Sequence, residues 1–299
     1  MDRLSDIGTI KEILNKYGFS FSKALGQNFL VNPSVCPRMA ENSGADRGVG
    51  VIEVGPGIGV LTCELAKRAE KVVAVELDKR LLPVLEDTLS EYNNIKVINA
   101  DILKLDLHTL INEEFAGLDV VVCANLPYYI TSPVIMKLLE DKLAIRSITV
   151  MVQKEAADRL CADLGTRQAG AVTAAVNYYA KPEMLFKVSS GSFMPPPKVD
   201  SAVIKMTLHD KPPVSVKSEQ LMFRVIKASF AQRRKTILNS LSNGFTLDKN
   251  SVSMAIENAG ISKTARAEQL KLDDFARLAN ELNIFIDKKK TETSDNFDV

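Results

Sequence analysis

Short apolar runs alternate with polar, glycine-containing turns through the first part of the chain. Four runs have the length and composition of buried strands: residues 50–54, 71–76, 95–98 and 118–123. A helical period follows the first of them at Leu61, Leu65 and Ala66. This order of elements predicts a Rossmann-like α/β unit, in which the carboxyl ends of the strands meet at one edge of the sheet.

Three further apolar or alternating runs predict that the sheet is completed to seven strands. They are residues 145–152, 171–180 and 201–208. Residues 154–160 have the pattern of a helix between them. The proline-rich residues 194–198 are expected to be extended, because a residue that precedes proline avoids the helical region.

The pattern changes to helices after Lys211 and the two prolines that follow it. Ser218 can cap a helix, and apolar residues recur at helical spacing behind it and again from Leu272. The predicted organisation is therefore an α/β domain over residues 1–210 and a small all-helical domain over 211–287. Residues 288–299 are polar, and we expect a disordered tail there.

Composition narrows the class of protein. The chain has 299 residues, 46% hydrophobic and 25% charged, which is typical of a globular protein. It shows neither an apolar run of membrane-spanning length nor a signal-peptide pattern at its start, so we expect it in the cytoplasm. Four scattered cysteines and two histidines predict neither disulfides nor a metal centre. The formal net charge of +1 does not decide for or against a nucleic acid partner.

Three of the predicted strand ends carry residues suited to a nucleoside cofactor. Gly55 and Gly57 allow a tight turn and close approach of a ligand, although Val60 stands where a dinucleotide fingerprint needs glycine or alanine, which weakens the case for NAD. Glu76 ends the next strand, where a carboxylate can accept ribose hydroxyls. Asp101 follows the third and can accept from an adenine amine. Alone, each acid would more often be a solvated loop residue.

The fourth strand ends in the sequence from Ala124 to Tyr129, which breaks the apolar run with an amide, a proline and two aromatics. The side-chain carbonyl of Asn125 and the backbone carbonyl of Leu126 can accept both hydrogens of an exocyclic aromatic amine. The ring of Tyr128 offers the same base a stacking face. An ordinary loop after a strand is the alternative, because asparagine and proline are common there.

Together these residues resemble the S-adenosylmethionine-dependent adenine N6-methyltransferases. More narrowly, the chain resembles the ribosomal RNA adenine dimethyltransferases through four stretches, residues 25–30, 125–133, 193–203 and 230–236. Many members carry Tyr-Asn-Ile-Ser-Thr from the position of Tyr128, and this chain departs from that sequence at Tyr129, Thr131 and Ser132. The departure lies outside the core positions, from Asn125 to Tyr128.

The resemblance implies a seven-stranded methyltransferase sheet, S-adenosylmethionine as cofactor, and cofactor contacts at Asn28, Leu30 and Asn125. It implies a monomer that adds two methyl groups to each of two neighbouring adenosines. These lie in a hairpin loop near the 3′ end of small-subunit ribosomal RNA, and the reaction belongs to subunit biogenesis. Phe193 would face Tyr128 across a flipped base; the alternative is a core phenylalanine before a rigid linker.

A basic cluster, Arg233, Arg234 and Lys235, lies in a stretch from Gln220 to Leu247 that contains no acid. Such a run is usually a solvated helix face. Beside a base-binding site, a basic helix is better explained as a contact to RNA phosphates, which fix position without reading sequence. We therefore expect the helical domain to bind RNA.

Two other functions remain open from the sequence. A related methyltransferase that acts on large-subunit RNA and gives macrolide resistance shares much of the catalytic domain, although residues 193–203 and 230–236 favour the small subunit. A non-catalytic RNA-binding assembly factor that kept the fold is the other. The intact stretch from Asn125 to Tyr128 argues against loss of chemistry.

Overall fold

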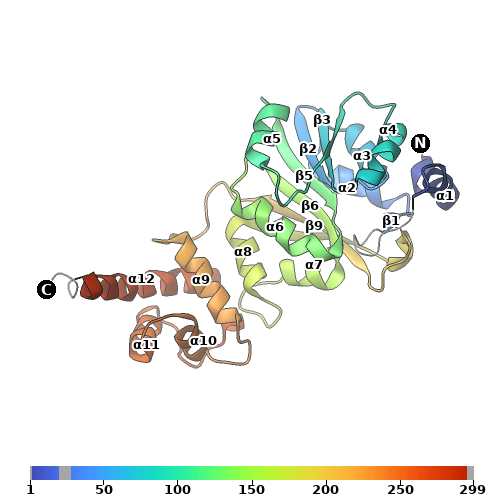
Figure 1. Ribbon diagram of the computed structural model, residues 1–299. Coiled ribbons are helices and arrows are strands. Elements are labelled where there is room, and N and C mark those ends of the chain that lie inside the picture. Colours follow the sequence, from blue (N-terminus) through green and yellow to red (C-terminus); the bar gives the residue numbers. More distant parts are fainter. Residues whose placement is uncertain (1, 20–27, 295–299) are drawn as a thin grey trace. The chain divides into compact units, whose positions relative to one another are not determined.

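The computed structural model describes residues 2–19 and 28–294 (Figure 1). Residues 25–27 of the first family motif and residues 295–299 of the expected tail lie outside this part of the chain. The chain forms two compact units. The first contains Met1–Asp158 and Ala180–Leu208, and the second contains Arg159–Tyr179 and His209–Val299.

A seven-stranded sheet in the order β4-β3-β2-β5-β6-β9-β7 forms the centre of the first unit. Its strands are β2 (Val49–Val54), β3 (Lys71–Glu76), β4 (Ile95–Asn99), β5 (Asp119–Asn125), β6 (Ser147–Gln153), β7 (Ala180–Val188) and β9 (Ser201–Leu208). The strands from β4 to β6 are parallel, whereas β9 is antiparallel to both β6 and β7. The predicted α/β fold with seven strands is confirmed.

Alternation along β2 shows how the sheet is covered on both faces. Val51 packs in a core cluster with residues of α2 (Val35–Ser43) and α3 (Val60–Ala66). Its neighbour Gly50 faces the other way, toward the ring of Phe115, which follows α5 (Leu107–Glu114). Every residue of β2 is buried, including Glu53, as expected for a central parallel strand that is covered on both faces.

The remaining elements of the first unit complete its edges and the mouth of its sheet (Figure 1). A two-stranded antiparallel pair joins β1 (Phe29–Leu30) to β8 (Phe193–Met194), two segments far apart in the sequence. The helix α1 (Ile7–Lys16) shares a core cluster with α4 (Leu82–Thr88) and with Phe29. The other helices are α6 (Thr131–Glu140) and α7 (Lys154–Leu160), whose last two residues already belong to the second unit.

The second unit is helical. It contains α8 (Ala171–Tyr179), α9 (Glu219–Phe230), α10 (Ile237–Gly244), α11 (Lys249–Asn258) and α12 (Leu272–Ser294). Apolar residues from all five helices share one core. Serine and aspartate caps open α9 and α11: Ser218 Oγ accepts from Leu221 N and Asp248 Oδ1 from Ser251 N. No helix in the described part of the chain is long and apolar enough to cross a membrane.

The prediction of a strand over residues 171–180 was wrong. This segment forms α8, and the strand begins only at Ala180. Half of the apolar residues of the segment are alanines, which favour a helix, and Ala174 and Tyr178, four positions apart, are buried together in the core of the second unit. Thr173 fixes the start of the helix because its hydroxyl accepts from Gly170 N at 2.9 Å.

Domain bounds also differ from those expected. The change near residue 210 has its counterpart after Leu208, but residues 159–179 belong with the helical unit, so the chain enters that unit twice. The tail expected from residue 288 is helical as far as Ser294, where α12 ends.

Candidate active site

A cavity of about 310 Å³ lies at the carboxyl ends of β2, β3, β4 and β5. Ten residues predicted from the sequence line it: Asn28, Leu30, Gly55, Gly57, Glu76, Asp101, Asn125, Leu126, Tyr128 and Phe193. The last strand positions of a parallel sheet share one edge, and β1 and β8 close its side. The structure thus brings together the residues predicted to hold a cofactor and those predicted to hold a base.

The turn after β2 approaches the cavity with its backbone. Gly55, Gly57 and Gly59 all have positive φ, at 69°, 61° and 90°. A Cβ on Gly57 would stand 3.3 Å from the ring of Phe29, so a larger residue there would push against the wall of the cavity. Gly57 therefore has to be glycine both for conformation and for space.

Glu76 is buried, with 6% of its surface exposed, yet it lines the cavity. Its Oε1 accepts from the backbone N–H of Asp78 at 2.7 Å. Burial raises the pKa of its carboxyl group, against the lowering effect of backbone N–H groups from Asp78 and Gly57. A carboxylate fixed in this way can still accept hydrogen bonds from a ribose diol.

Asp101 is partly exposed beside the same cavity, and its Oδ1 accepts from Leu103 N at 3.0 Å. Two apolar residues that the sequence reasoning missed follow the two carboxylates directly, Leu77 after Glu76 and Ile102 after Asp101. The sequence did contain a signal for these two residues: at two neighbouring strand ends, an acidic residue is followed directly by an apolar one. Such a pair provides an apolar wall for a flat ring.

Glu53 on β2 is another site residue that the sequence reasoning missed. It lines the cavity with only 1% of its surface exposed. Its Oε2 is buried without a hydrogen-bond partner among the described residues. Burial raises the pKa of this carboxyl group to about 8; the nearby Thr62 hydroxyl opposes the shift, and the charge of Glu76 adds to it. A buried polar atom without a partner beside a cavity indicates a polar ligand group there.

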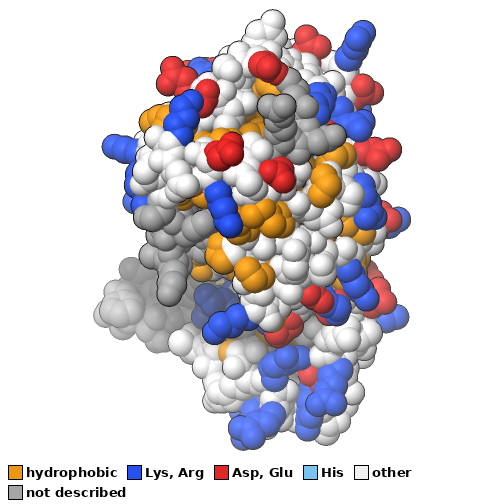
Figure 2. Space-filling model, turned by 90° about the vertical axis from the view of Figure 1, so that its right-hand side faces the viewer, with side chains coloured by type: hydrophobic (Ala, Val, Ile, Leu, Met, Phe, Trp, Pro, Cys, Tyr) orange, Lys and Arg blue, Asp and Glu red, His pale blue; other side chains and the backbone are white. Residues whose placement is uncertain are grey.

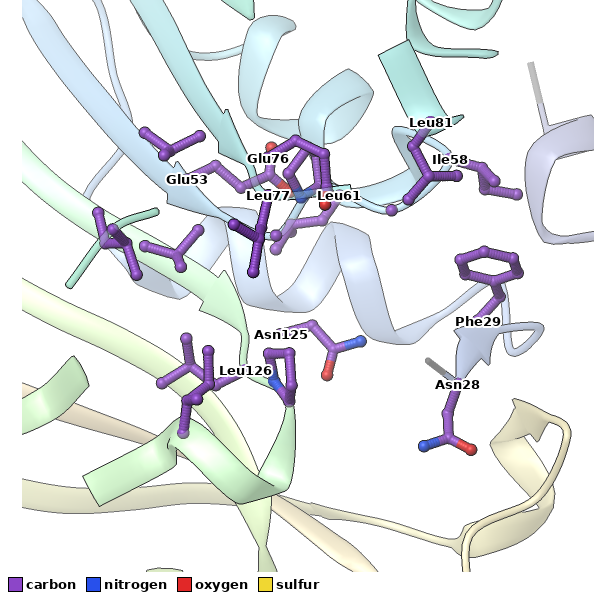
Figure 3. A pocket seen from close by; sticks show the side chains of 18 of the residues that line it. Asn28, Phe29, Glu53, Ile58, Leu61, Glu76, Leu77, Leu81, Asn125 and Leu126 are labelled. Atoms are coloured by element: carbon purple, nitrogen blue, oxygen red, sulfur yellow. The ribbon is translucent and has the colours of Figure 1, made fainter. Parts of the chain in front are cut away.

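Asn125 is the last residue of β5, and Figure 3 shows its amide across the cavity from Glu53 and Glu76. The next residue, Leu126, is 1% exposed, and its N–H donates to Met151 O on β6 at 3.2 Å. This bond holds the turn against the sheet. Pro127 O accepts from Ile130 N at 3.1 Å, which closes the short 3-10 turn η4 (Tyr128–Ile130).

The two aromatic residues predicted for base binding both line the cavity. The hydroxyl of Tyr128 lies 2.7 Å from Ser201 Oγ, and burial raises the pKa of this phenol. Phe193 is 4% exposed and belongs to the core cluster that α2 and α3 share with the sheet. It is therefore a core residue and a wall of the cavity at once. That it faces Tyr128 across a base stays a prediction.

The basic cluster lies in the second unit, but not on a helix as the sequence predicts. Arg233, Arg234 and Lys235 are exposed in the turn between α9 and α10, and Thr236 caps the second helix. Arg233 is engaged within its own unit: it donates to Arg167 O at 2.8 Å and lies 3.8 Å from Glu268. Figure 2 shows several lysine and arginine side chains close together in the lower part of this face, with acidic side chains among them.

Comparison with known proteins identifies the family. Residues 18–284 match the model of a family described as ribosomal RNA adenine dimethylase. The chain belongs to this family. It is 51% identical over 279 residues to ribosomal RNA small subunit methyltransferase A of Geobacillus thermodenitrificans, covering 92% of the chain and 95% of the relative. The protein of the same name from Alkaliphilus oremlandii is 48% identical over 283 residues, covering 94% and 99%.

Two solved structures resemble the chain over most of its length. A dimethyladenosine transferase from Plasmodium falciparum is 26% identical with a TM-score of 0.71, covering 85% of this chain and 97% of its own. The 23S ribosomal RNA methyltransferase ErmE is 28% identical with a TM-score of 0.66, covering 86% of this chain and 100% of its own. The expected family, its methyltransferase fold and the enzymatic function are thereby confirmed.

The enzyme is a ribosomal RNA adenine dimethyltransferase that depends on S-adenosylmethionine. The residues around the cavity fit this cofactor. Glu76 and Asp101 offer acceptors for a ribose and an amine, Leu77 and Ile102 an apolar wall, and Glu53 a buried carboxyl oxygen without a partner among the described residues. The described residues contain no group of three or more His, Cys, Asp or Glu side chains placed to hold a metal ion.

Proposed function

We propose that this enzyme transfers methyl groups from S-adenosylmethionine to N6 of two adjacent adenosines in the 3′-terminal hairpin loop of 16S ribosomal RNA. Each adenosine becomes dimethylated during small-subunit biogenesis. The observation that carries the proposal is the cavity that joins Glu76 and Asp101 to the turn from Asn125 to Tyr128. Relatives named for the small subunit, which align over more than nine tenths of both chains, support this substrate over large-subunit RNA.

The chemistry requires orientation more than activation. S-adenosylmethionine supplies a methyl group that is already electrophilic because it is bonded to a sulfonium. The amine of adenine is a poor nucleophile, since its lone pair is delocalised into the ring. The carbonyl oxygens of Asn125 and Leu126 would accept the two amine hydrogens, favour a pyramidal nitrogen and direct its lone pair along the line of displacement.

The surroundings of Leu126 support this role. Its N–H is bound to Met151 O on the neighbouring strand, and its side chain is buried, so the turn cannot shift without breaking sheet contacts. An acceptor that is fixed before the reaction does not have to reorganise in the transition state. After transfer the nitrogen carries a positive charge and loses its proton readily, so this step needs no strong base.

Stacking on Tyr128 would hold the base once it has left the RNA. The phenol is anchored to Ser201, which fixes the direction of the Tyr128 side chain beside the cavity. Stacking on an aromatic ring offsets part of the cost of taking a base out of its RNA structure. A second methylation requires the monomethylated amine to turn and still fit between the same carbonyls.

The helical unit supplies positive charge for the RNA backbone. Arg234 and Lys235 are exposed in the turn before α10, and we propose that they contact phosphates. Arg233 has two partners within the unit, so its first role is to hold that turn in place. We further propose that the enzyme works as a monomer in the cytoplasm, on an assembling small-subunit particle.

Methyl transfer from labelled cofactor tests the function directly. Unmodified small subunits, large subunits and naked 16S RNA would be offered as substrates, and the products mapped by nuclease digestion and mass spectrometry. We expect dimethyladenosine at two neighbouring positions of the small-subunit RNA. Modification of large-subunit RNA alone would establish the macrolide-resistance type of activity, and no transfer to any substrate would leave an RNA-binding assembly factor.

A further inference from the structure

Two consecutive tyrosines follow β5, and they stand in different surroundings. Tyr128 has its hydroxyl bound to Ser201 Oγ. Tyr129 lines the same cavity but leaves 53% of its surface exposed. Both lie in the 3-10 turn η4, where consecutive side chains point about 120° apart. The two rings therefore serve different parts of the cavity.

The order of the strands shows which part each ring serves. Ser201 begins β9, which lies beyond β6 on one side of β5. Glu76 ends β3 and Asp101 follows β4, and these strands lie beyond β2 on the other side. Tyr128 is tied toward the first side. Tyr129 lines the cavity together with Glu76 and Asp101 on the second side. Burial first, and then the charges of Asp101 and Glu76, raise the pKa of its phenol.

Exposed apolar side chains also gather at this side of the cavity. Among the described residues, six large hydrophobic side chains are exposed: Ile7, Leu77, Leu103, Tyr129, Val199 and Met254. Three of them, Leu77, Leu103 and Tyr129, line this one cavity. An exposed apolar cluster beside carboxylates in a cavity is typical of a ligand site that the ligand itself completes.

We propose that Tyr129 covers the adenosine part of S-adenosylmethionine, with Leu77 and Leu103 at the same mouth, and is a cofactor-binding residue rather than a second platform for RNA bases. The inference rests on the proposed place of the cofactor between Glu76 and Asp101. Its ring excludes water from the adenosine. Its hydroxyl stays protonated beside two carboxylates and donates rather than repels.

A cofactor contact at Tyr129 has a different effect from an RNA contact there. S-adenosylmethionine and its product S-adenosylhomocysteine share the adenosine part, so Tyr129 acts on both alike. Removal of a stacked aromatic ring at a partly exposed site corresponds to an affinity change of about threefold to tenfold. We therefore expect Tyr129→Ala to weaken both molecules by this factor, and Tyr129→Phe to stay within about twofold of the parent.

Calorimetry with S-adenosylmethionine and with S-adenosylhomocysteine, on the full-length protein without RNA, tests this expectation. Ile7→Ala removes another exposed apolar side chain from the same unit, outside the cavity, and serves as the matched control. Thermal unfolding of each variant checks that it is folded. RNA binding by Tyr129→Ala, measured separately by filter retention, should equal that of the parent.

Two results would overturn the inference. Unchanged affinity of Tyr129→Ala for both cofactor forms would remove Tyr129 from the cofactor site, and weaker RNA binding by that variant would make it a platform for RNA. Glu76→Ala distinguishes failure of the inference about Tyr129 from failure of the proposed cofactor site. If Glu76→Ala weakens the cofactor and Tyr129→Ala does not, only the present inference fails. If Glu76→Ala also keeps full affinity, the proposed place of the cofactor is wrong.

Discussion

The hydroxyl groups of Tyr128 and Ser201 lie 2.7 Å apart, although the two residues are 73 positions apart in the chain. The bond ties the turn after β5 to the first residue of β9. It also gives the phenol hydroxyl a structural partner. If Tyr128 holds the base as proposed, the face of its ring rather than the hydroxyl makes that contact.

This relationship sharpens a prediction for Tyr128. Tyr128→Phe keeps the stacking face and removes one hydrogen bond, so methyl transfer should stay within about tenfold of the parent, since a neutral hydrogen bond contributes about 0.5 to 1.5 kcal/mol. Tyr128→Ala should be far slower, because stacking contributes about 1 to 3 kcal/mol per base. Ser201→Ala is the matched control and should resemble Tyr128→Phe in single-turnover kinetics. An inactive Tyr128→Phe beside an active Ser201→Ala would assign the hydroxyl a direct part in the chemistry.

Glu76 provides a prediction about the cofactor. Glu76→Ala should weaken S-adenosylmethionine binding by about 1.5 to 3 kcal/mol, the contribution of a hydrogen bond to a charged group. Because the pKa of Glu76 is raised, its carboxylate is protonated at a higher pH than usual as the solution is acidified, and affinity should fall with it. Calorimetry over a series of pH values measures both effects. Equal affinity in folded parent and variant at neutral pH would exclude Glu76 from the site.

The raised pKa of Glu53 predicts how folding stability depends on pH without cofactor. The folded protein keeps the Glu53 proton up to about pH 8, whereas the unfolded chain releases it near the ordinary pKa of 4.5. Between these values the folded state binds more protons, so the free energy of unfolding should fall as pH rises, by at most about 1.4 kcal/mol per pH unit. Denaturant titrations should show that Glu53→Gln removes this slope. A slope that persists unchanged in Glu53→Gln would assign it to other groups.

The sequence predicted that the ends of β2 to β5 meet at one site, because each strand is a short apolar run and the candidate residues lie at or directly after its end. Contacts between residues far apart in the sequence could not be predicted from these local patterns. Nothing near Tyr128 points to Ser201, and Glu53 acquires its raised pKa only when tertiary packing buries it. These features depend on the assembled fold rather than on local pattern.

The errors in the fold prediction have a similar origin. The segment that forms α8 is apolar at neighbouring positions, so its pattern suits either a buried strand or a buried helix. What decides is the partner: Ala174 and Tyr178 pack in the core of the helical unit. The segment belongs to that unit while β7, immediately after it, joins the sheet. The prediction placed a single domain boundary near residue 210, whereas the helical unit is formed by two separate segments of the chain.

The basic turn provides a prediction that separates its three cations. Arg234→Gln with Lys235→Gln should weaken binding to 16S RNA and reduce the slope of log affinity against log salt by about 0.7 to 0.9 for each phosphate that is no longer neutralised. Cofactor affinity should not change. Arg233→Gln is the control. Arg233 contacts Arg167 O and Glu268 within its own unit, so its loss should lower the thermal stability of the protein more than its affinity for RNA. If the salt dependence of RNA affinity is unaltered in the double variant, Arg234 and Lys235 are solvated surface residues that do not contact RNA phosphates.

Asn125 carries the most direct prediction about the chemistry, because its carbonyl oxygen is proposed to orient the amine only as the transition state forms. Asn125→Ala should fold, since the turn is also held by the bond from Leu126 N to Met151 O. It should transfer methyl groups about 10² to 10³ times more slowly, the usual cost of removing one preorganised group.

Single-turnover kinetics on unmodified small subunits, with saturating cofactor, measure that rate. Because Asn125 also lines the cofactor side of the cavity, calorimetry must show first that Asn125→Ala is saturated under the assay conditions. Asn125→Asp is the informative companion, since it keeps an acceptor oxygen at the same position and should recover part of the rate that alanine removes. An Asn125→Ala enzyme that transfers methyl groups at the parental rate would show that the amide does not orient the reacting nitrogen, and would leave that task to the carbonyl of Leu126.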